Sequence, residues 1–176
     1  MNTINLKLTL ILILCIFSDS LSAQTIEKLG QHKIDDHIYT VSKYGHEGKF
    51  SVQENLTVIS RVRKKSKNLT NIEFASFSSG ETLNSAFIKV LGRDRIRELV
   101  PEGAVFLRLY FNTDGKILSV EFVLNKKSEL TLKEINRLTI FIKNNVSFKI
   151  PSYVEKKSKL CTPLTQVIHF NKLLYM

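Results

Sequence analysis

The chain has 176 residues, and its 26 Lys and Arg residues against 16 Asp and Glu residues give a formal charge of +10 at pH 7. This length is enough to bury one hydrophobic core and excludes two large domains. Of the two cysteines, only Cys161 lies beyond the N-terminal apolar run, so we expect no internal disulfide after processing.

The first residues have the pattern of an export signal. Lys7 precedes an apolar run over residues 8–17, and the small residues Ser22 and Ala23 follow. The apolar run is shorter than the ~20 residues that span a bilayer. We therefore expect an exported protein with a signal peptide over residues 1–23 that is cleaved after Ala23, and an uncleaved membrane anchor is the alternative.

Residues 24–79 have the weakest pattern of the chain. Residues 38–44 and 56–62 have β-rich composition, and Gly45 and Gly48 indicate a turn between them. We expect an N-terminal β-rich extension of two or three strands, and whether it joins the main sheet is left open.

Two helical segments are expected next. Gly92 separates the first segment from a further helical turn over residues 94–99, and Pro101 ends this second segment. The apolar residues at helical spacing in the first segment are Leu83, Phe87, Ile88 and Leu91.

A β-hairpin is predicted around Asp114 and Gly115, which provide the positive φ angles of a type I′ turn. Thr113 then lies opposite Lys116. This register pairs apolar residues on one face: Val105 with Leu124, Leu107 with Phe122, Leu109 with Val120, and Phe111 with Leu118. We predict that this is the core face, because a shift of one residue would place Ser119 among the apolar side chains.

The opposite face of the hairpin is more polar. It pairs Arg108 with Glu121, Tyr110 with Ser119, and Phe106 with Val123. We expect a solvated or half-covered surface with a cross-strand ion pair.

A helix and a last strand complete the predicted domain. Thr131 and Glu134 have the spacing of a capping box, which marks the start of the helix, and Pro151 ends the segment that follows the helix. The last strand, residues 164–170, begins after Pro163 and is suited to extend the edge of the hairpin. The apolar residues at helical spacing are Leu132, Ile135, Leu138, Ile142 and Val146.

The predicted fold class is α+β, a small antiparallel sheet with two helices packed on one face. Residues 81–172 resemble the C-terminal domain of TonB, the periplasmic energy transducer, and TonB-like domains of Gram-negative envelope proteins. The motifs are Gly103 at a strand start, Phe111-Asn112-Thr113-Asp114-Gly115-Lys116-Ile117 at the turn, and Phe148-Lys149-Ile150-Pro151 after the helix. The resemblance implies a TonB C-terminal-like domain over residues 80–176.

In TonB the exposed strand edge pairs with a short segment of an outer-membrane receptor. The resemblance therefore implies a non-catalytic protein, in the periplasm or at the outer surface of a Gram-negative bacterium. It would bind another envelope protein through a sheet edge, or form a homodimer by edge pairing. The chain has three prolines and no proline-rich spacer, so we expect no energy transduction.

A run of basic residues supports an alternative function. Clustered cations attract anionic lipid or cell-surface polysaccharide, although a solvated loop is the simpler interpretation. No aromatic residues alternate with the cations, so nucleic acid is not an expected partner. Residues 64–71 are also the expected joint between the extension and the domain. The candidate binding residues are Arg61, Arg63, Lys64, Lys65 and Lys67.

Two other groupings have suitable chemistry without a recognised spacing. Cys161 and His169 would act as nucleophile and base only within hydrogen-bond reach. We favour a polar loop over a metal site, a buried thiol over a catalytic one, and predict no cofactor and no enzymatic activity. The residues with metal-ligand chemistry are His32, Asp35, Asp36, His37 and His46.

Overall fold

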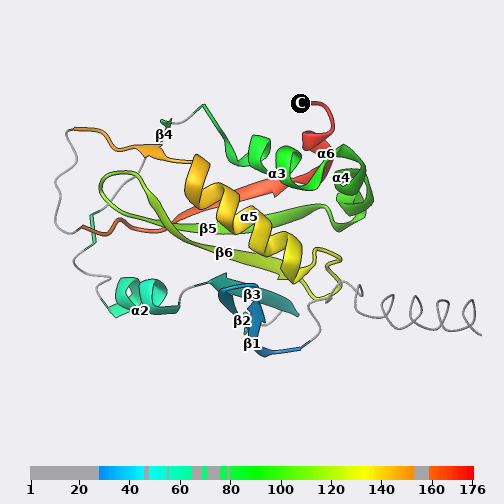
Figure 1. The fold of residues 1–176 in the computed structure, drawn as a ribbon, viewed down its shortest axis with the longest axis horizontal. Helices are drawn as coiled ribbons and strands as arrows, with labels where there is room; N and C mark the ends of the chain where they lie inside the picture. The colour runs from blue at the N-terminus through cyan, green and yellow to red at the C-terminus, as the bar shows by residue number, and fades with distance from the viewer. Residues whose placement is uncertain are drawn as a thin grey trace, which may run out of the picture.

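The computed structural model describes residues 28–45, 48–54, 56–64, 69–70, 76–78, 80–152 and 159–176. Within them, an antiparallel six-stranded sheet with the strand order β1-β2-β3-β6-β5-β8 lies at the centre of the fold (Figure 1). Its strands are β1 (Gly30–Ile34), β2 (His37–Tyr44), β3 (Lys49–Glu54), β5 (Ala104–Phe111), β6 (Ile117–Asn125) and β8 (Leu164–His169). A separate short pair joins β4 (Ser76–Phe77) and β7 (Phe148–Lys149).

Helices and the sheet share one core, which confirms the predicted α+β class. In Figure 1, α5 lies in front of β5 and β6, and α3 lies beside it. The predicted break at Gly92 separates α3 from α4. The helices are α2 (Leu56–Lys64), α3 (Leu83–Leu91), α4 (Arg93–Leu99), the 3-10 turn η3 (Val100–Glu102), α5 (Leu132–Asn145) and α6 (Phe170–Leu173).

The predicted start of α5 is confirmed. The Thr131 hydroxyl accepts from the Glu134 backbone N–H at 3.2 Å, and the Glu134 carboxylate accepts from the Thr131 backbone N–H at 2.8 Å. Arg95 of α4 also donates to Glu134, at 2.7 Å. The capping box therefore also joins two helices. The predicted apolar face is buried at Leu132, Ile135, Leu138, Ile142 and Val146.

The helix-facing side of the β5–β6 hairpin has the predicted register over most of its length. Leu107 lies opposite Phe122, and Leu109 opposite Val120. All four side chains are completely buried. Strict alternation on two paired strands therefore predicted this face well, because one register brings the apolar sets together.

The turn itself differs from the predicted type I′ turn. Gly115 has a φ of 80°, whereas Asp114 is not among the residues with positive φ. The Gly115 N–H donates to the Asn112 carbonyl, and the Asn112 N–H donates to the Lys116 carbonyl. These bonds define a three-residue loop, a type I turn followed by glycine in the left-handed region.

The longer loop moves the register next to the turn. Phe111 pairs with Ile117, and Tyr110 pairs with Ser119, so Leu118 is the extra residue of a bulge. The predicted pairing of Phe111 with Leu118 is therefore wrong. Ile117 is buried in the core instead, and Leu118 is partly exposed.

Gly115 also approaches a distant segment closely. A Cβ atom at this position would lie 1.8 Å from the carbonyl oxygen of Phe148. The Phe148 N–H donates to the Gly115 carbonyl at 2.9 Å. The segment after α5 therefore contacts the turn at a place where only glycine fits.

The N-terminal extension continues the main sheet, which answers the question that the sequence left open. β2 and β3 form a hairpin, and β3 pairs with β6 over residues 49–53. The predicted strand over residues 38–44 is confirmed, with its turn at Gly45 and Gly48. Its partner in the hairpin is β3, which was not predicted. The domain boundary near residue 80 stays a prediction.

Residues 56–62 were predicted to be a strand and belong to helix α2. Ile59 and Val62 are three positions apart, so they lie on one side of the helix, where they pack with Tyr110 and Leu69. A second small core on the opposite face of the sheet therefore outweighs the β propensity of this segment.

No helix in the described part of the chain is long and apolar enough to cross a membrane. The predicted signal peptide lies outside the described residues, as does most of the predicted joint over residues 64–71.

Candidate functional site

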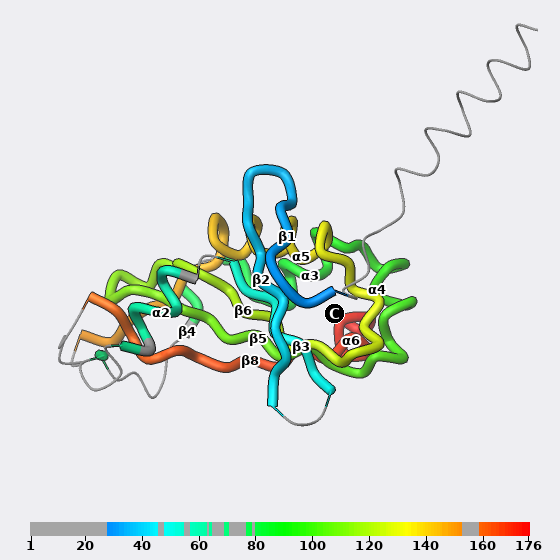
Figure 2. The backbone as a smooth tube through the Cα atoms, turned by 90° about the horizontal axis from the view of Figure 1, so that it is seen from below, coloured from blue at the N-terminus to red at the C-terminus, as the bar shows by residue number. Residues whose placement is uncertain are grey.

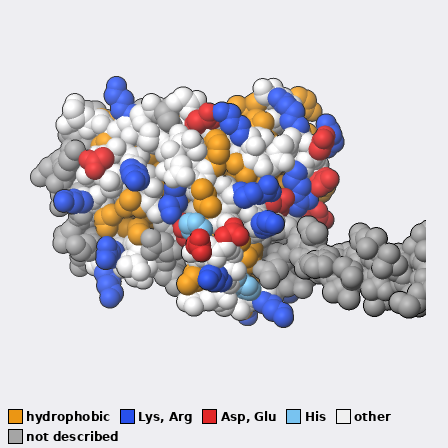
Figure 3. Space-filling model, viewed as in Figure 1, with side chains coloured by type: hydrophobic (Ala, Val, Ile, Leu, Met, Phe, Trp, Pro, Cys, Tyr) orange, Lys and Arg blue, Asp and Glu red, His pale blue; other side chains and the backbone are white. Residues whose placement is uncertain are grey.

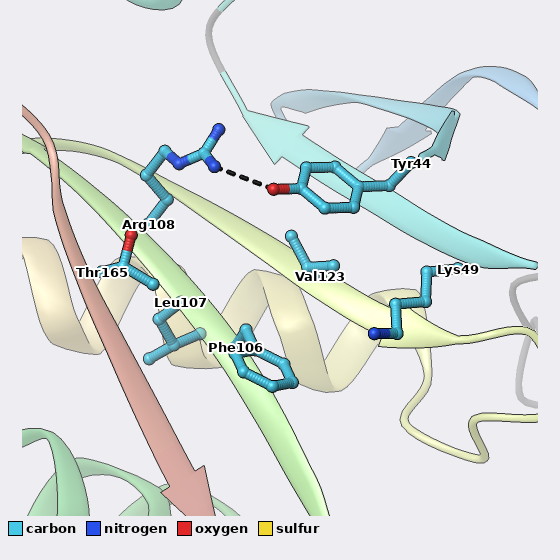
Figure 4. Close-up of a pocket in the computed structure, with 7 residues that line it drawn as sticks. All are labelled: Tyr44, Lys49, Phe106, Leu107, Arg108, Val123 and Thr165. Carbon is cyan, nitrogen blue, oxygen red and sulfur yellow. Dashed lines mark hydrogen bonds between the residues drawn. The ribbon is translucent and has the colours of Figure 1, made fainter. Parts of the chain in front are cut away.

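The candidate site lies on the face of the sheet that points away from α3 and α5, called the outer face here. Its floor is formed by residues of β5 and β6 that alternate with the core residues. Figure 2 shows β1, β2 and β3 running steeply across β5, β6 and β8. Because of this crossing, side chains from the end of the β2–β3 hairpin reach over the floor (Figure 4).

The outer face contains a buried carboxylate, Glu121, which is 1% exposed. One of its oxygens accepts from Ser51 at 2.8 Å and from Gln53 at 2.6 Å. The other accepts from Tyr110 at 2.7 Å and from Arg108 at 3.4 Å. These bonds compensate for the loss of water around the charge, as a buried ion requires.

The predicted ion pair between Arg108 and Glu121 is confirmed, but its surroundings were predicted wrongly. Tyr110, Ser119 and Glu121 are each at most 2% exposed, so this part of the face is neither solvated nor half-covered. Contacts of Tyr110 with α2 close the region. Residues of β3 cover Glu121 and Ser119, so the exposure was misjudged because neither α2 nor β3 was predicted.

Burial and the neighbouring Glu121 carboxylate raise the pKa of Tyr110 to about 12. The pKa of Arg108 is also raised: burial acts against its charge, but the attraction of Glu121 is among the effects that outweigh it. Both side chains therefore keep their protons at neutral pH, and Tyr110 remains a hydrogen-bond donor to the carboxylate.

Beyond Glu121 the outer face opens into a pocket with a volume of about 190 Å³. Phe106 forms its centre and is 40% exposed. The Lys49 ammonium lies 5.6 Å from the centroid of the Phe106 ring. Arg108 donates to the Tyr44 hydroxyl at 2.8 Å (Figure 4). The lining residues come from five strands: Tyr44, Lys49, Phe106, Leu107, Arg108, Val123 and Thr165.

Strand β8 borders this pocket and forms one edge of the sheet. It pairs antiparallel with β5, as predicted, and the described residues place no strand on its other side. The Phe170 N–H donates to the Gly103 carbonyl, so these two residues form a hydrogen-bonded pair. In an antiparallel ladder such pairs alternate with pairs whose backbone groups point away from each other. Backbone groups of Thr165, Val167 and His169 therefore point away from β5.

The predicted basic residues are only partly within the described structure. Arg61 and Lys64 are exposed on α2, three positions apart. Arg63 lies in the same helix, with a side chain outside the described part, and Lys65 and Lys67 also lie outside it. On the face in Figure 3, Lys and Arg side chains are scattered rather than gathered in one patch.

The histidine and aspartate residues near the N-terminus have separate protein contacts. His37 Nδ1 lies 2.7 Å from Glu54, and Asp35 accepts from Asn136 of α5 at 2.9 Å. His32 Nε2 lies 2.8 Å from the Lys28 carbonyl. The described residues contain no group of three or more suitable ligands for a metal ion. Asp36 lies in the β1–β2 turn, and His46 lies outside the described residues.

Cys161 and His169 are far apart. The Cys161 N–H donates to Phe111 at one end of β5, and His169 pairs with Ala104 at the other. Seven residues of a strand separate these positions by about 23 Å. The two side chains therefore cannot form a nucleophile and base pair.

Sequence reasoning missed the pocket because its members are distant in the chain. Tyr44, Lys49 and Thr165 belong to three strands with no shared motif. Phe106 was the one signal, since an aromatic residue on the polar face of the hairpin breaks the alternation.

Comparisons with known proteins support the fold. No family model and no curated protein matches the sequence. A crystal structure of a DUF5043 family protein from Bacteroides uniformis ATCC 8492 is similar, with a TM-score of 0.55 and 10% sequence identity. The similarity covers 83% of this chain and 93% of the other. At this identity the likeness shows a shared fold alone.

Proposed function

We propose that this protein is a non-catalytic binding module that adds an extended segment of another protein to the edge strand β8. The observation that supports this best is the row of backbone groups at Thr165, Val167 and His169, which point away from β5. A segment that pairs with them gains backbone hydrogen bonds whatever its sequence, and side-chain contacts on the outer face provide specificity.

The composition of β8 supports the proposal when it is compared with the opposite edge. Natural edge strands usually carry charged residues or proline, which prevent pairing with other chains. Between Leu164 and His169 there is no Lys, Arg, Asp, Glu or Pro, whereas β1 carries Lys33 and begins at Gly30 with a φ of 124°. β8 is therefore the edge that is better suited to pairing.

The chain itself pairs with the segment just before β8. The Thr70 N–H donates to the Leu160 carbonyl, and the Thr162 N–H donates to the Thr70 carbonyl, each at 3.0 Å. This bridge is parallel. A partner segment would continue along the same edge from the point where the contact with Thr70 ends.

The partner that we propose is an envelope protein, and the compartment is the periplasm or outer surface of a Gram-negative bacterium. The export pattern of residues 1–23 and the resemblance to TonB-like domains support this assignment. A second copy of the chain is another candidate for the same edge, through pairing of two β8 strands.

Proline substitution tests the proposal directly. Val167→Pro removes one outward N–H and leaves the bonds to β5 in place, because proline is tolerated where the N–H faces solvent. Peptides are first selected from a random displayed library on the wild-type protein. We expect Val167→Pro to weaken their binding roughly tenfold or more, and the control Val167→Thr, which keeps the N–H, to bind nearly normally.

Hydrogen exchange locates the bound peptide. We expect protection of the amides of Thr165, Val167 and His169, with no change at Gln166, whose N–H already faces β5. Protection at another surface, equal binding to Val167→Pro, or a library that yields no peptide dependent on this edge would each contradict the proposal.

The alternative is a surface for anionic lipid or polysaccharide, favoured by the exposed Arg61 and Lys64 of α2. Such binding would weaken steeply with ionic strength, whereas strand addition would weaken only slightly. Vesicles that contain anionic lipid, tested with the Arg61→Gln/Lys64→Gln double variant, distinguish the two. Binding that falls with both salt and this double variant would favour the alternative.

A further inference from the structure

The outer-face pocket has an apolar floor, which is distinct from the backbone groups that strand addition uses. Phe106 lies between Val123 of β6 and Val167 of β8, which are its cross-strand partners. Phe106 and Val167 are each 40% exposed. A large aromatic residue on the polar side of a sheet is unusual, and an apolar group that covers it would remove this surface from water.

One cation is held in a fixed position above this floor. Arg108 donates to Glu121 and to the Tyr44 hydroxyl, and its guanidinium stacks near the Tyr44 ring, with 5.7 Å between its central carbon and the ring centroid. A guanidinium has five N–H donors, and the described residues engage two of its nitrogens. Arg108 is therefore positioned in advance and retains donors for a ligand.

A second cation lies on the other side of the floor. The Lys49 ammonium is above the Phe106 ring, and Figure 4 shows Lys49 and Arg108 on different sides of Phe106 and Val123. The acid nearest to Arg108, Glu121, is buried and already accepts four side-chain donors within the described structure. The side of the pocket next to Arg108 is therefore suited to a negative charge.

The size of the pocket limits its occupant. Sites for drug-sized molecules have volumes of ~300 Å³ or more, whereas this pocket has about 190 Å³. The space fits a single ring or branched alkyl group with one small polar group. A flexible chain or a nucleotide is too large.

We infer that the pocket binds a small carboxylic acid with one apolar group, aromatic or branched. The ring or alkyl group would cover Phe106 and Val123, and the carboxylate would accept from Arg108, with Lys49 and the Thr165 hydroxyl at the rim. The planar guanidinium matches a carboxylate in shape. This site is separate from the backbone edge of β8, so either proposal can fail alone.

Phenylacetate is the probe for the test, with NMR titration of the full chain as the measurement. For a ligand of this size, a dissociation constant in about the millimolar range is expected. We expect shift changes at Tyr44, Phe106 and Thr165, and at least roughly tenfold weaker binding of phenylacetamide, which has the ring without the charge. Inorganic phosphate has the charge without the ring, and it should bind weakly.

Variants separate the two parts of the site. Arg108→Gln should weaken phenylacetate roughly tenfold or more, Lys49→Gln should weaken it less, and the control Lys133→Gln, on the exposed side of α5, should have no effect. Phe106→Ser tests the floor without removing a charge and should abolish saturable binding. NMR spectra of the unliganded variants establish that each is folded.

Three results would overturn the inference. They are equal binding of phenylacetate and phenylacetamide, equal binding of phosphate, and shift changes that remain in the folded Phe106→Ser variant.

Discussion

Around Glu121, the outer face of the β5–β6 hairpin is buried as completely as the helix-facing side, but by opposite chemistry. On the helix side, Leu107, Leu109 and Phe122 are fully buried among apolar side chains. On the outer side, Ser119 and Glu121 are at most 1% exposed and are hydrogen-bonded. Burial alone therefore does not identify the apolar core. One face depends on packing, and the other depends on satisfying a charge.

The largest expected effect tests the packed face. Phe122→Ala removes a fully buried ring, and we expect a loss of about 3–5 kcal/mol in the free energy of unfolding. The control is Phe106→Ala on the outer face, where the ring is 40% exposed. Chemical denaturation should show a much smaller loss, below about 1 kcal/mol. Equal losses would mean that the two faces are packed alike.

The charged face is tested at Glu121. Glu121→Ala removes a shared acceptor of Arg108, Tyr110 and Gln53. We expect a loss of about 3 kcal/mol, because Arg108 can still reach water. Glu98→Ala removes an acid that is 62% exposed and should cost less than about 1 kcal/mol. A Glu121→Ala variant as stable as the wild type would show that the buried network contributes nothing.

The Tyr110 hydroxyl gives a smaller effect with a defined pH dependence. Burial first, and then Glu121, raise the pKa of Tyr110 to about 12. A raised pKa contributes stability that is present below the unfolded value of ~10 and is lost as pH rises from there toward 12. Tyr110→Phe should cost about 1 kcal/mol at neutral pH.

Absorbance titration of the tyrosinate form checks this shift. Burial raises the pKa of both Tyr39 and Tyr110, so we expect two tyrosines to titrate late in the wild type. The component with a pKa of about 12 should disappear in Tyr110→Phe. The control Tyr175→Phe removes a ring that is 92% exposed and should leave this late titration unchanged. A wild-type protein whose tyrosines all titrate near their ordinary pKa would contradict the burial of Tyr110.

The smallest expected effect concerns Glu134 at the start of α5. Burial acts to raise the pKa of Glu134, but hydrogen bonds from Arg95 and Thr131 lower it below its ordinary value. The stability from this group is therefore present above the unfolded pKa of ~4.3 and is lost as pH falls below it. Glu134→Gln should reduce the loss of stability in acid, and the exposed Glu129→Gln should not.

Prediction from sequence worked where the evidence was local or repeated. Alternating apolar residues determined the pairing of Leu107 with Phe122, and the capping box of Thr131 and Glu134 located the start of α5. The turn was predicted less well. Asp-Gly also suits a longer loop, and the resulting shift placed Ile117 in the core instead of Leu118.

Most of the candidate site could not be predicted in this way. Arg108 and Glu121 were paired correctly because they lie opposite each other in one hairpin. Tyr44, Lys49 and Thr165 join them only because the β2–β3 hairpin crosses the sheet and β8 returns beside β5. The proposed edge follows from strand order, which the periodicity of one strand does not encode.

The amino-acid sequence by itself determined the α+β class, the register of the central hairpin away from its turn, and the face that the helices cover. These features depend on residues that are close in the chain or that alternate strictly, so short-range physics decides them. The tertiary structure alone decided that residues 56–64 are helical, that Glu121 is buried and that five strands line one pocket. Each of these depends on contacts between distant segments, whose free energy outweighs local preference.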